Sequence, residues 1–494
     1  MSDVVQKLWG FCHTLRHDGI DYGDYIEQIT YLLFLKMADE RGLDLSRTRG
    51  AGADHWIDCS WPALAAKSGP ALINHYVEVL LVLGEQKGLL GDIFREAIPR
   101  FNSADNLKRL IGLIDETAWI RLEVDVKAAA FEGLLEKAAS EGKKGAGQYF
   151  TPRLLIQSIV RCVRPDPRGA GDLAGFAICD PACGTGGFLV AAYEWLMGEL
   201  REPLSPKMAL RVRNGTYFGQ ELVPRPRRLA LMNLCLHGLE PEIKAGDSIY
   251  LPPDERRFDV VFTNPPFGTR GANQIPRRED LQIKTSNKQL NFLQHVLTIL
   301  KPGGRAAVVV PDNCLFADQA GEVFRILTQV CDLHTVLRLP NGTFTPYSPG
   351  TKTNVVFFTK GPSTENVWVY DARTNVARVT KKDRPLTATH LAAFETCFGA
   401  DPNGRSRRDP RDSFDGRWRS FPIAEVQARD FKIDGLKWLR DESLDDGDEL
   451  LYPEELAADA IAELTSAVGE LNAILKMLEG EPEVESPLVL RRAE

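Results

Sequence analysis

The pattern of apolar and polar residues divides the chain into a helical part and a part in which strands and helices alternate. In residues 1–140, apolar side chains recur at intervals of three and four, as on the buried face of a helix. The first stripe comprises Val4, Leu8, Phe11 and Leu15, and the second comprises Tyr25, Ile29, Leu32 and Leu33. Two further apolar clusters occupy residues 71–83 and 107–114. We therefore expect a helical N-terminal domain over residues 1–140.

From residue 153 onward, short apolar runs typical of buried strands alternate with helical segments. The expected strands cover residues 176–180, 215–221, 243–248, 258–262, 306–310, 333–339 and 354–358. The expected helices cover residues 155–163, 189–200, 229–239, 292–300 and 323–330. This alternation predicts an α/β fold with a doubly wound, mostly parallel sheet. Only a short turn-rich loop separates the last two strands, so we expect an antiparallel pair that closes a seven-stranded sheet.

The α/β domain is expected over residues 141–400, followed by a charged segment and a C-terminal helix in residues 401–494. The helix is predicted by an apolar seam with alternating spacings of four and three. The seam comprises Ala457, Ile461, Leu464, Val468, Leu471, Leu475 and Leu478. Such a seam packs either on the chain's own core or on a helix of another subunit. We favour the second interpretation, a partner-binding helix.

Composition limits the classes of partner and of site. The formal net charge of −8 excludes a surface that binds polyanions everywhere, but it allows a local basic groove. The nine cysteines contain no CxxC pair, and His13 and His17 have no evident third ligand, so we expect no metal site. No signal peptide and no apolar block long enough to span a bilayer are evident. We expect a soluble, cytoplasmic protein without membrane contact.

One expected strand ends in a sequence that indicates a ligand site. The apolar run 258–262 is followed by Thr263 and then by Asn264-Pro-Pro-Phe267. Two successive prolines fix φ and remove two backbone donors, so the chain leaves the sheet at Asn264. A polar side chain next to an aromatic one at a strand's carboxyl end is placed where open α/β sheets bind ligands. The alternative interpretation is a proline-rich turn that closes the strand.

A glycine-rich loop follows the first expected strand, in the sequence Asp180-Pro-Ala-Cys-Gly-Thr-Gly-Gly-Phe188. Strand, glycine turn and helix form a nucleotide-type entry, but neither a phosphate-binding Gly-Lys-Ser/Thr nor a GxGxxG is present. Asp180, Glu221 and Asp247 stand at the ends of three successive expected strands. Asp180, at the end of the first strand, would suit a ligand that carries an amine. Each acid alone is more often a helix cap or a turn residue.

A basic glycine-rich linker, residues 140–147, precedes the α/β part. It leads to Thr151 and Pro152, which suit the N-cap and the first position of a helix. The alternative interpretation is that this turn lies over a bound ligand and contributes to its site.

The sequences Asp180–Phe188 and Asn264–Phe267 resemble the two hallmark motifs of S-adenosylmethionine-dependent adenine DNA methyltransferases. Residues 148–153 come before both motifs, which is the γ order of that family. Within the family, the helical N-terminal part and Gly147-Gln-Tyr-Phe-Thr-Pro152 are similar to the modification subunit of a type I restriction–modification system. The long segment 201–214 before Glu221 departs from the family's pattern.

The resemblance implies transfer of a methyl group from S-adenosyl-L-methionine to the exocyclic N6 of adenine in DNA. The implied catalytic residues are Asn264, Pro265, Pro266 and Phe267. Asn264 and the Pro265 carbonyl would accept hydrogen bonds from the amino group, and Phe267 would stack on a flipped-out base. The implied cofactor-binding residues are Gln148, Tyr149, Phe150, Thr151, Pro152, Arg153, Asp180, Ala182, Thr185, Gly186, Gly187, Phe188, Glu221 and Asp247. Among these, the three acids would bind the amine, the ribose and the adenine of the cofactor, in chain order.

The resemblance also implies partners: DNA, a specificity subunit that reads the sequence, and a restriction subunit, with two modification subunits per specificity subunit. The polar segment 269–290 is expected to be either a mobile loop that meets DNA phosphates or a solvated loop. Its basic residues are Arg270, Arg277, Arg278, Lys284 and Lys288. Two other functions stay open, namely methylation of a protein glutamine amide or an RNA guanine amino group, and a non-catalytic assembly scaffold.

Overall fold

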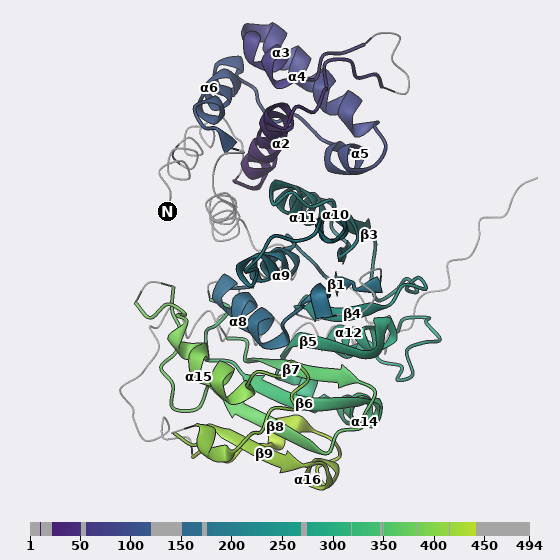
Figure 1. The fold of residues 1–494 in the computed structure, drawn as a ribbon, viewed down its shortest axis with the longest axis vertical. Helices are drawn as coiled ribbons and strands as arrows, with labels where there is room; N and C mark the ends of the chain where they lie inside the picture. Colours follow the sequence, from purple (N-terminus) through teal and green to yellow (C-terminus); the bar gives the residue numbers. More distant parts are fainter. Residues whose placement is uncertain are drawn as a thin grey trace, which may run out of the picture.

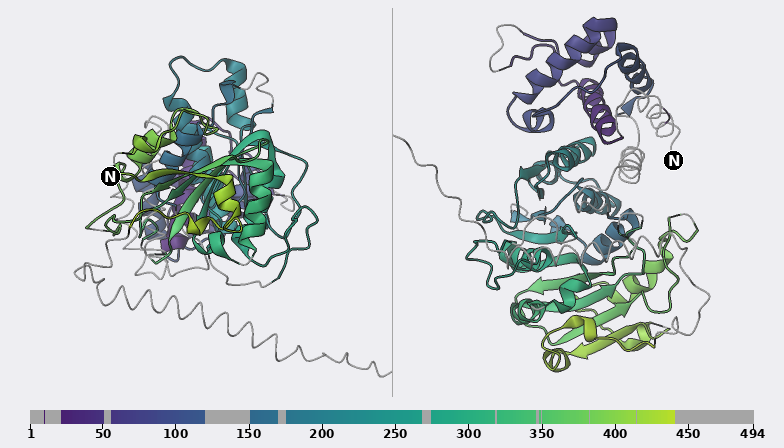
Figure 2. Two further views of the ribbon diagram at one scale, coloured as in Figure 1. Left: turned by 90° about the horizontal axis from the view of Figure 1, so that it is seen from below. Right: turned by 180° about the vertical axis from the view of Figure 1, so that it is seen from behind.

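The computed structural model describes residues 10, 22–50, 56–119, 151–169, 175–267 and 274–440, apart from residues 318, 346, 347, 349, 382 and 414. Helices occupy one end of the molecule, and a twisted sheet flanked by helices occupies the rest (Figure 1; Figure 2). The predicted seam over residues 457–478, the stripe from Val4 to Leu15, and the expected cofactor residues Gln148, Tyr149 and Phe150 lie outside the described residues.

The N-terminal part is helical, as predicted from its apolar spacing. Its described helices are α2 (Tyr22–Glu40), α3 (Trp61–Ala66), α4 (Gly69–Gly84), α5 (Leu89–Phe94) and α6 (Ala104–Asp115). The stripe of Tyr25, Ile29, Leu32 and Leu33 is buried on α2, which confirms that expectation. The side chains of Ser60 and Ser103 accept hydrogen bonds from backbone N–H groups in the first turns of α3 and α6. These caps explain why the two helices begin where they do.

The sheet confirms the predicted α/β class but has nine strands rather than the expected seven. The strands are β1 (Ile178–Asp180), β2 (Tyr217–Glu221), β3 (Glu242–Ala245), β4 (Phe258–Thr263), β5 (Leu300–Pro311), β6 (Cys331–Arg338), β7 (Thr353–Lys360), β8 (Asn366–Asp371) and β9 (Trp418–Pro422). Their spatial order is β3-β2-β1-β4-β5-β7-β6-β8-β9. The five strands β1 to β5 are parallel, and β7 is antiparallel to both β5 and β6, as predicted for the last expected pair.

The two additional strands extend the sheet beyond β6. β8 runs parallel to β6, and β9 runs antiparallel to β8, so the sheet continues past residue 400. β9 lies in a charged stretch, and only Trp418 and Phe421 among its five residues are buried. Two buried residues give too short a pattern to indicate a strand.

Helices cover both faces of the sheet (Figure 1). One face carries α8 (Arg153–Val163), α9 (Gly187–Gly198), α11 (Pro224–Leu236) and α15 (Thr389–Phe398), and the other carries α12 (Lys288–Ile299), α14 (Ala320–Val330) and α16 (Ile423–Gln427). Two further helices in this part are α10 (Pro206–Asn214) and α13 (Asn313–Phe316). Side chains of β4 alternate between the two cores, with Val260 and Phe262 in one and Val261 in the other. The long segment before Glu221 thus contains a helix, α10, whose start is capped by Ser205.

Helix α11 joins the N-terminal helices to the sheet through a group of arginines. Arg228 pairs with Glu27 of α2 and also donates to the Arg95 carbonyl at 2.7 Å. Arg225 pairs with Asp24 of α2, and Arg227 lies 3.2 Å from Asp92 of α5. Burial lowers the pKa of Arg228 to about 10, so its side chain is still charged at neutral pH. These arginines therefore serve a contact between two parts of the chain.

Arg228→Met is expected to lower the free energy of unfolding by about 2 kcal/mol, because Glu27 would keep a buried charge without its nearest cation. Urea denaturation of the full chain measures this change. The control is Arg213→Met, which removes an exposed ion pair with Glu240 on the same side of the sheet and should change stability by at most about 0.5 kcal/mol. Equal losses in the two variants would contradict the role of Arg228 in the contact.

Candidate active site

Parallel pairing brings the predicted polar residues to one edge of the sheet. β1 lies between β2 and β4, and β3 lies beyond β2, with all four strands running the same way. Their carboxyl ends therefore meet at a shared edge. Asp180 and Glu221 are the last residues of β1 and β2, Asp247 follows β3 by two residues, and Asn264 follows β4 directly. The structure thus brings the three acids and the Asn-Pro-Pro-Phe sequence, below called the tetrapeptide, to one place.

The glycine loop after β1 is shaped by the acids beside it. Gly184 and Gly186 have φ angles of 53° and 81°, in the left-handed region that favours glycine. The Gly184 N–H donates to Glu221 Oε2 at 2.9 Å, and the Ala182 N–H donates to Asp180 Oδ1 at 3.0 Å. Helix α8 packs closely on the loop, since a Cβ on Gly187 would stand 3.0 Å from Ile156 Cδ1.

Three contacts around this loop were not evident in the sequence. Asn233 of α11 donates to the Thr185 carbonyl at 3.2 Å, and Ser248 donates to the Pro181 carbonyl at 2.5 Å. Gly219 lets β2 approach the loop, because a Cβ there would stand 3.1 Å from Cys183 Sγ. These residues are far apart in the chain, and no spacing rule links them. Phe188, one of the residues implied to bind the cofactor, lies in the core, where it stacks on Phe262 with ring centroids 5.5 Å apart.

The two acids nearest the loop have raised pKa values; Asp180 is buried, and Glu221 is half-buried. Burial raises the pKa of Asp180 to about 7, the Ala182 N–H acts in the opposite direction, and the nearby charge of Glu221 raises it further. Burial also raises the pKa of Glu221, although the N–H groups of Val223 and Gly184 favour its ionised form. Both acids are therefore placed to respond to a ligand's positive charge or hydrogen-bond donors.

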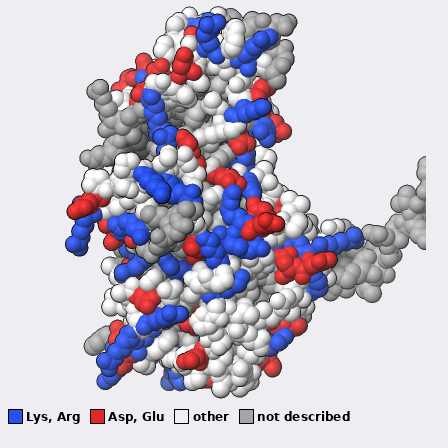
Figure 3. All heavy atoms as spheres, turned by 45° about the vertical axis from the view of Figure 1, so that its right-hand side comes forward, with Lys and Arg blue, Asp and Glu red and all other residues white. Residues whose placement is uncertain are grey.

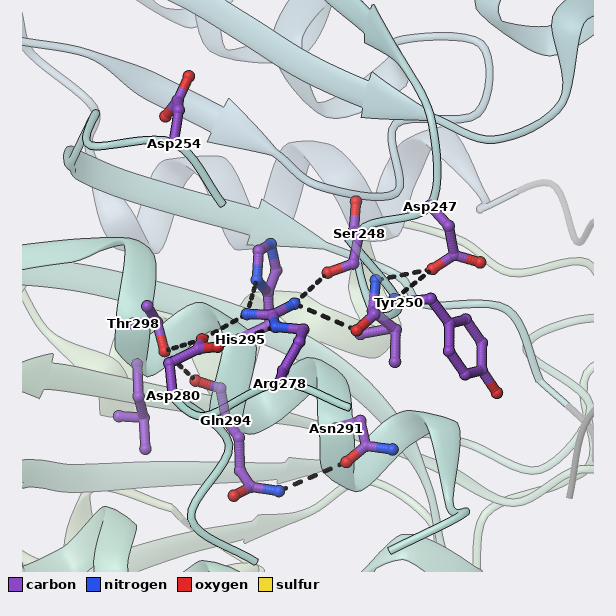
Figure 4. Close-up of polar contacts among 12 residues, drawn as sticks. Asp247, Ser248, Tyr250, Asp254, Arg278, Asp280, Asn291, Gln294, His295 and Thr298 are labelled. Carbon is purple, nitrogen blue, oxygen red and sulfur yellow. Dashed lines mark hydrogen bonds and ion pairs between the residues drawn. The ribbon is translucent and has the colours of Figure 1, made fainter. Parts of the chain in front are cut away.

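Asp247 sits in a tight turn after β3. Its Oδ1 accepts hydrogen bonds from the N–H groups of Ile249 and Tyr250, at 2.7 and 3.0 Å (Figure 4). Both bonds converge on one carboxylate oxygen. They fix the direction of the carboxylate relative to the ends of β2 and β3.

The two polar atoms of the Asn264 amide differ: its nitrogen has a hydrogen-bond partner, and its oxygen has none among the described residues. Its Nδ2 donates to Thr151 Oγ1 at 2.8 Å, across 113 residues of sequence. Its Oδ1 is buried and has no hydrogen-bond partner among the described residues. A buried acceptor without a partner costs free energy unless a ligand satisfies it. At the end of β4, Asn264 therefore presents a carbonyl oxygen that no described residue satisfies, on an amide held by Thr151.

The expected N-cap role of Thr151 is wrong. Helix α8 begins at Arg153, its N-cap is Pro152, and no side chain caps it. The hydroxyl of Thr151 is instead directed to Asn264. The guanidinium of Arg153 lies against α9, where it donates to both carboxylate oxygens of Glu194 at 3.0 and 3.1 Å. Residues 151–153 thus connect the tetrapeptide to α8 and α9.

The aromatic residue of the tetrapeptide is held by a second aromatic that the sequence did not indicate. Phe267 is 6% exposed and meets Phe344 edge to face, with ring centroids 5.3 Å apart and planes at 81°. Phe344 lies in the turn-rich loop between β6 and β7, whose composition indicated only a change of direction. The two prolines differ in exposure, since Pro265 is buried and Pro266 is exposed.

In the segment after the tetrapeptide, the structure contradicts the expected phosphate contact at one residue, Arg278. Residues 268–273, including Arg270, lie outside the described residues. Arg278 is 3% exposed, and its guanidinium donates to Asp280, to the Ser248 carbonyl and to His295 Nδ1 (Figure 4). The prediction of a phosphate contact is therefore wrong for Arg278, because Asp280 already neutralises its charge. Arg277 and Lys284 are exposed.

On the face drawn in Figure 3, basic and acidic side chains are interspersed.

Among the residues that the structure describes, no group of three or more His, Cys, Asp and Glu side chains is arranged to hold a metal ion. Within the same part of the chain, no helix has the length and apolar character needed to cross a membrane.

Comparison with known families covers almost the whole chain. The family described as N-6 DNA Methylase matches residues 123–446, and the HsdM N-terminal domain matches residues 4–121. The type I restriction enzyme StySJI methylase subunit of Salmonella typhimurium is 37% identical, over 97% of this chain and 95% of its own length. The EcoKI methylase subunit of Escherichia coli is 36% identical, over 98% of this chain and 97% of its own length.

Solved structures of type I restriction–modification proteins also match almost the whole chain. The crystal structure of the EcoKI M protein matches with a TM-score of 0.53 at 32% identity, covering 98% of both chains. A chain solved in work on complex assembly and conformational transition of the type I R-M system matches with a TM-score of 0.72 at 27% identity. That match covers 97% of this chain and 99% of the other.

Proposed function

Because the chain belongs to the N-6 DNA methylase family and, within it, to the methylase subunits of type I restriction enzymes, we propose that Asn264 holds the target amino group. The reaction is transfer of a methyl group from S-adenosylmethionine to the exocyclic N6 of adenine in DNA. The observation that carries the proposal is the buried Asn264 Oδ1, which has no partner among the described residues.

The chemistry of adenine explains why an acceptor is needed. The lone pair of the amino nitrogen is delocalised into the ring, so the nitrogen is a poor nucleophile. Two hydrogen-bond acceptors, Asn264 Oδ1 and the Pro265 carbonyl, would draw the amino group toward tetrahedral geometry and localise the lone pair. No strong base is required, and the rate would come from positioning and preorganised dipoles. Thr151 keeps the amide in the required orientation by accepting from Nδ2 at 2.8 Å.

The residues at the sheet edge fit the cofactor. When bound, S-adenosylmethionine supplies an electrophilic methyl group on a positively charged sulfur. Three acids on one edge suit a ligand that carries positive charge, and no phosphate-binding loop is present among them. In this proposal Asp180 binds the amine side, Glu221 the ribose and Asp247 the adenine, while residues 148–153, Thr185, Gly186 and Gly187 surround the methionine part. Arg153 would act through Glu194 on α9, given the direction of its guanidinium.

Cofactor affinity is expected to fall as the pH decreases through about 7, the pKa of Asp180. A carboxyl with a raised pKa is neutral below that pH, so it no longer attracts the ammonium group of the cofactor. Between about pH 7.5 and about pH 6, the dissociation constant should rise roughly tenfold. Isothermal calorimetry at both pH values measures the change. In Asp180→Asn the affinity should be low at both values, and an unchanged pH dependence in that variant would contradict the assignment.

Phe267 is proposed as the stacking surface for the flipped target base. Adenine N6 cannot be reached inside a duplex, so the base must leave the helix and be held by an aromatic surface. The edge-to-face contact with Phe344 would fix the rotation of the Phe267 ring. The Phe344 loop would then form part of the base pocket.

The assembly proposed for this chain follows its relatives. The comparisons include methylase subunits of type I restriction enzymes and a chain from work on type I complex assembly. We propose that this subunit acts in the cytoplasm with a specificity subunit, in a ratio of two to one, and with a restriction subunit. The predicted partner-binding helix around residues 457–478 would dock on the specificity subunit. Mass measurement of the co-expressed complex tests the ratio, and a one-to-one complex would contradict it.

Label distribution tests the function itself. The complex of this chain with its specificity subunit is incubated with methyl-labelled cofactor and unmethylated DNA, and with RNA and protein extracts in parallel. We expect label in adenine of DNA. Label in a protein glutamine or an RNA guanine, with none in adenine, would support the alternative methyltransferases, and no transfer at all would support a scaffold. The comparisons give these alternatives no support.

A further inference from the structure

The two prolines of the tetrapeptide leave few ways to hold its backbone. Pro265 and Pro266 have no N–H group, so the peptide can be fixed only through its carbonyls and neighbouring side chains. One such contact is present: Gln289 Nε2 donates to the Pro266 carbonyl at 2.7 Å. Gln289 is 4% exposed and is the second residue of α12. A helix from a later part of the chain therefore holds the tetrapeptide by its carbonyl side.

Helix α12 offers a rigid mount for this contact. Asn287 caps the helix by accepting a hydrogen bond from the Leu290 N–H at 3.1 Å, which fixes the first turn beside Gln289. Asn291, in the same turn, donates to the Thr285 carbonyl at 2.8 Å. The backbone of Gln289 is thus held by a capped and anchored helix end. Its side chain is held by burial and by the bond to Pro266.

The same helix is tied to the cofactor side of the site. His295, six residues after Gln289, lies 3.1 Å from the Arg278 guanidinium through Nδ1 (Figure 4). Burial, together with the charge of Arg278, lowers the pKa of His295 to about 3, so the ring is neutral and Nδ1 accepts. Arg278 in turn donates to the Ser248 carbonyl at 2.6 Å, directly after Asp247. One helix thus contacts the tetrapeptide at its start and, through Arg278, the Asp247 turn.

We propose that Gln289 is a positioning residue for methyl transfer, which fixes the tetrapeptide carbonyls relative to the cofactor edge through α12. The inference rests on the proposed function of Asn264 and Pro265. A held Pro266 carbonyl sets the plane of the following peptide and limits rotation of the preceding one, so the Pro265 carbonyl stays aimed at the base. Gln289 does not touch the reacting atoms. Its loss should therefore slow the chemical step while the cofactor binds normally.

The test compares two buried glutamines of the same helix in the full complex with the specificity subunit. Gln289→Met keeps the length and burial of the side chain but cannot donate to Pro266. Gln294→Met is the matched control, because Gln294 is also 4% exposed and bonds backbone at Ile283, outside the tetrapeptide. The measured quantities are the single-turnover methylation rate at saturating cofactor, the cofactor dissociation constant and the melting temperature.

We expect Gln289→Met to slow single-turnover methylation roughly 10- to 100-fold, with cofactor affinity within about twofold of the unaltered chain. Both variants should lower the melting temperature by similar amounts, because each loses a buried hydrogen bond. Gln294→Met should nevertheless keep the single-turnover rate within about threefold of the unaltered chain. An unchanged rate in Gln289→Met, or an equal loss in both variants, would overturn the positioning role. Absence of adenine methylation in the unaltered complex would instead reject the proposed function, so the two failures are distinct.

Discussion

Asn264→Ala is expected to slow methyl transfer about a thousandfold or more while leaving cofactor affinity within about twofold. The substitution removes the buried Oδ1 that would accept a hydrogen bond from the adenine amino group. The amino nitrogen would then keep its delocalised lone pair. The activation barrier to methyl transfer would rise, because the transition state loses one preorganised hydrogen bond. Among the described residues, the Asn264 side chain bonds Thr151 and none of the three acids at the other strand ends, so the cofactor site should persist. Single-turnover kinetics and calorimetry measure the two quantities.

Loss of cofactor binding together with activity would contradict this separation of roles. The matched control is Thr151→Val, which leaves Asn264 in place but removes the acceptor for its Nδ2. The amide would then be free to rotate, and its amide nitrogen would be left without the observed partner. We expect a smaller loss of rate than in Asn264→Ala, of roughly 10- to 100-fold. A Thr151→Val variant as slow as Asn264→Ala would assign the hydroxyl a direct role instead.

Glu221→Ala is expected to raise the cofactor dissociation constant about 100-fold or more. The carboxylate shapes the glycine loop through the Gly184 N–H and the following turn through the Val223 N–H, both at 2.9 Å. It would also accept hydrogen bonds from the ribose hydroxyls. Removing the carboxylate would therefore both remove the contact with the cofactor and weaken the support of the glycine loop. Calorimetric titration with S-adenosylmethionine measures the effect.

Glu221→Gln separates the two contributions. An amide keeps one acceptor oxygen for the loop but loses the negative charge, so we expect a rise in the dissociation constant of roughly tenfold. At saturating cofactor, the single-turnover rate of both Glu221 variants should return to within about threefold of the unaltered chain. An unchanged dissociation constant in Glu221→Ala would remove Glu221 from the cofactor site.

The sheet edge could be predicted from sequence because parallel strands bring their carboxyl ends together. If 176–180, 215–221 and 258–262 are parallel strands of one sheet, then Asp180, Glu221 and Asn264 lie at the same sheet edge. β1 pairs in parallel with both β2 and β4, which confirms this prediction. What lies beside these residues could not be deduced in the same way. Thr151 reaches Asn264 from 113 residues away, and Phe344 comes from a loop whose composition indicates only a turn.

The basic segment shows why composition was misleading there. Five cations within residues 269–290 suggested phosphate contacts, yet Arg278 is buried between Asp280 and the Ser248 carbonyl. The sequence does not show which group pairs with a charged side chain. For Arg278 that partner is Asp280, two residues later in the chain. The arginines of α11 show the same point, because Arg225 and Arg228 pair with acids of α2. In both places basic residues serve contacts within the chain.

The rate of Asn264→Asp relative to Asn264→Ala tests the central claim most directly. Aspartate keeps an oxygen where Asn264 Oδ1 stands, and its second oxygen can accept from the Thr151 hydroxyl after that group rotates. Alanine keeps neither. Single-turnover methylation of adenine, measured at saturating cofactor in the full complex, should be at least about tenfold faster for Asn264→Asp, with equal cofactor affinities. Equal rates in the two variants would show that this oxygen is not the acceptor for the target amino group.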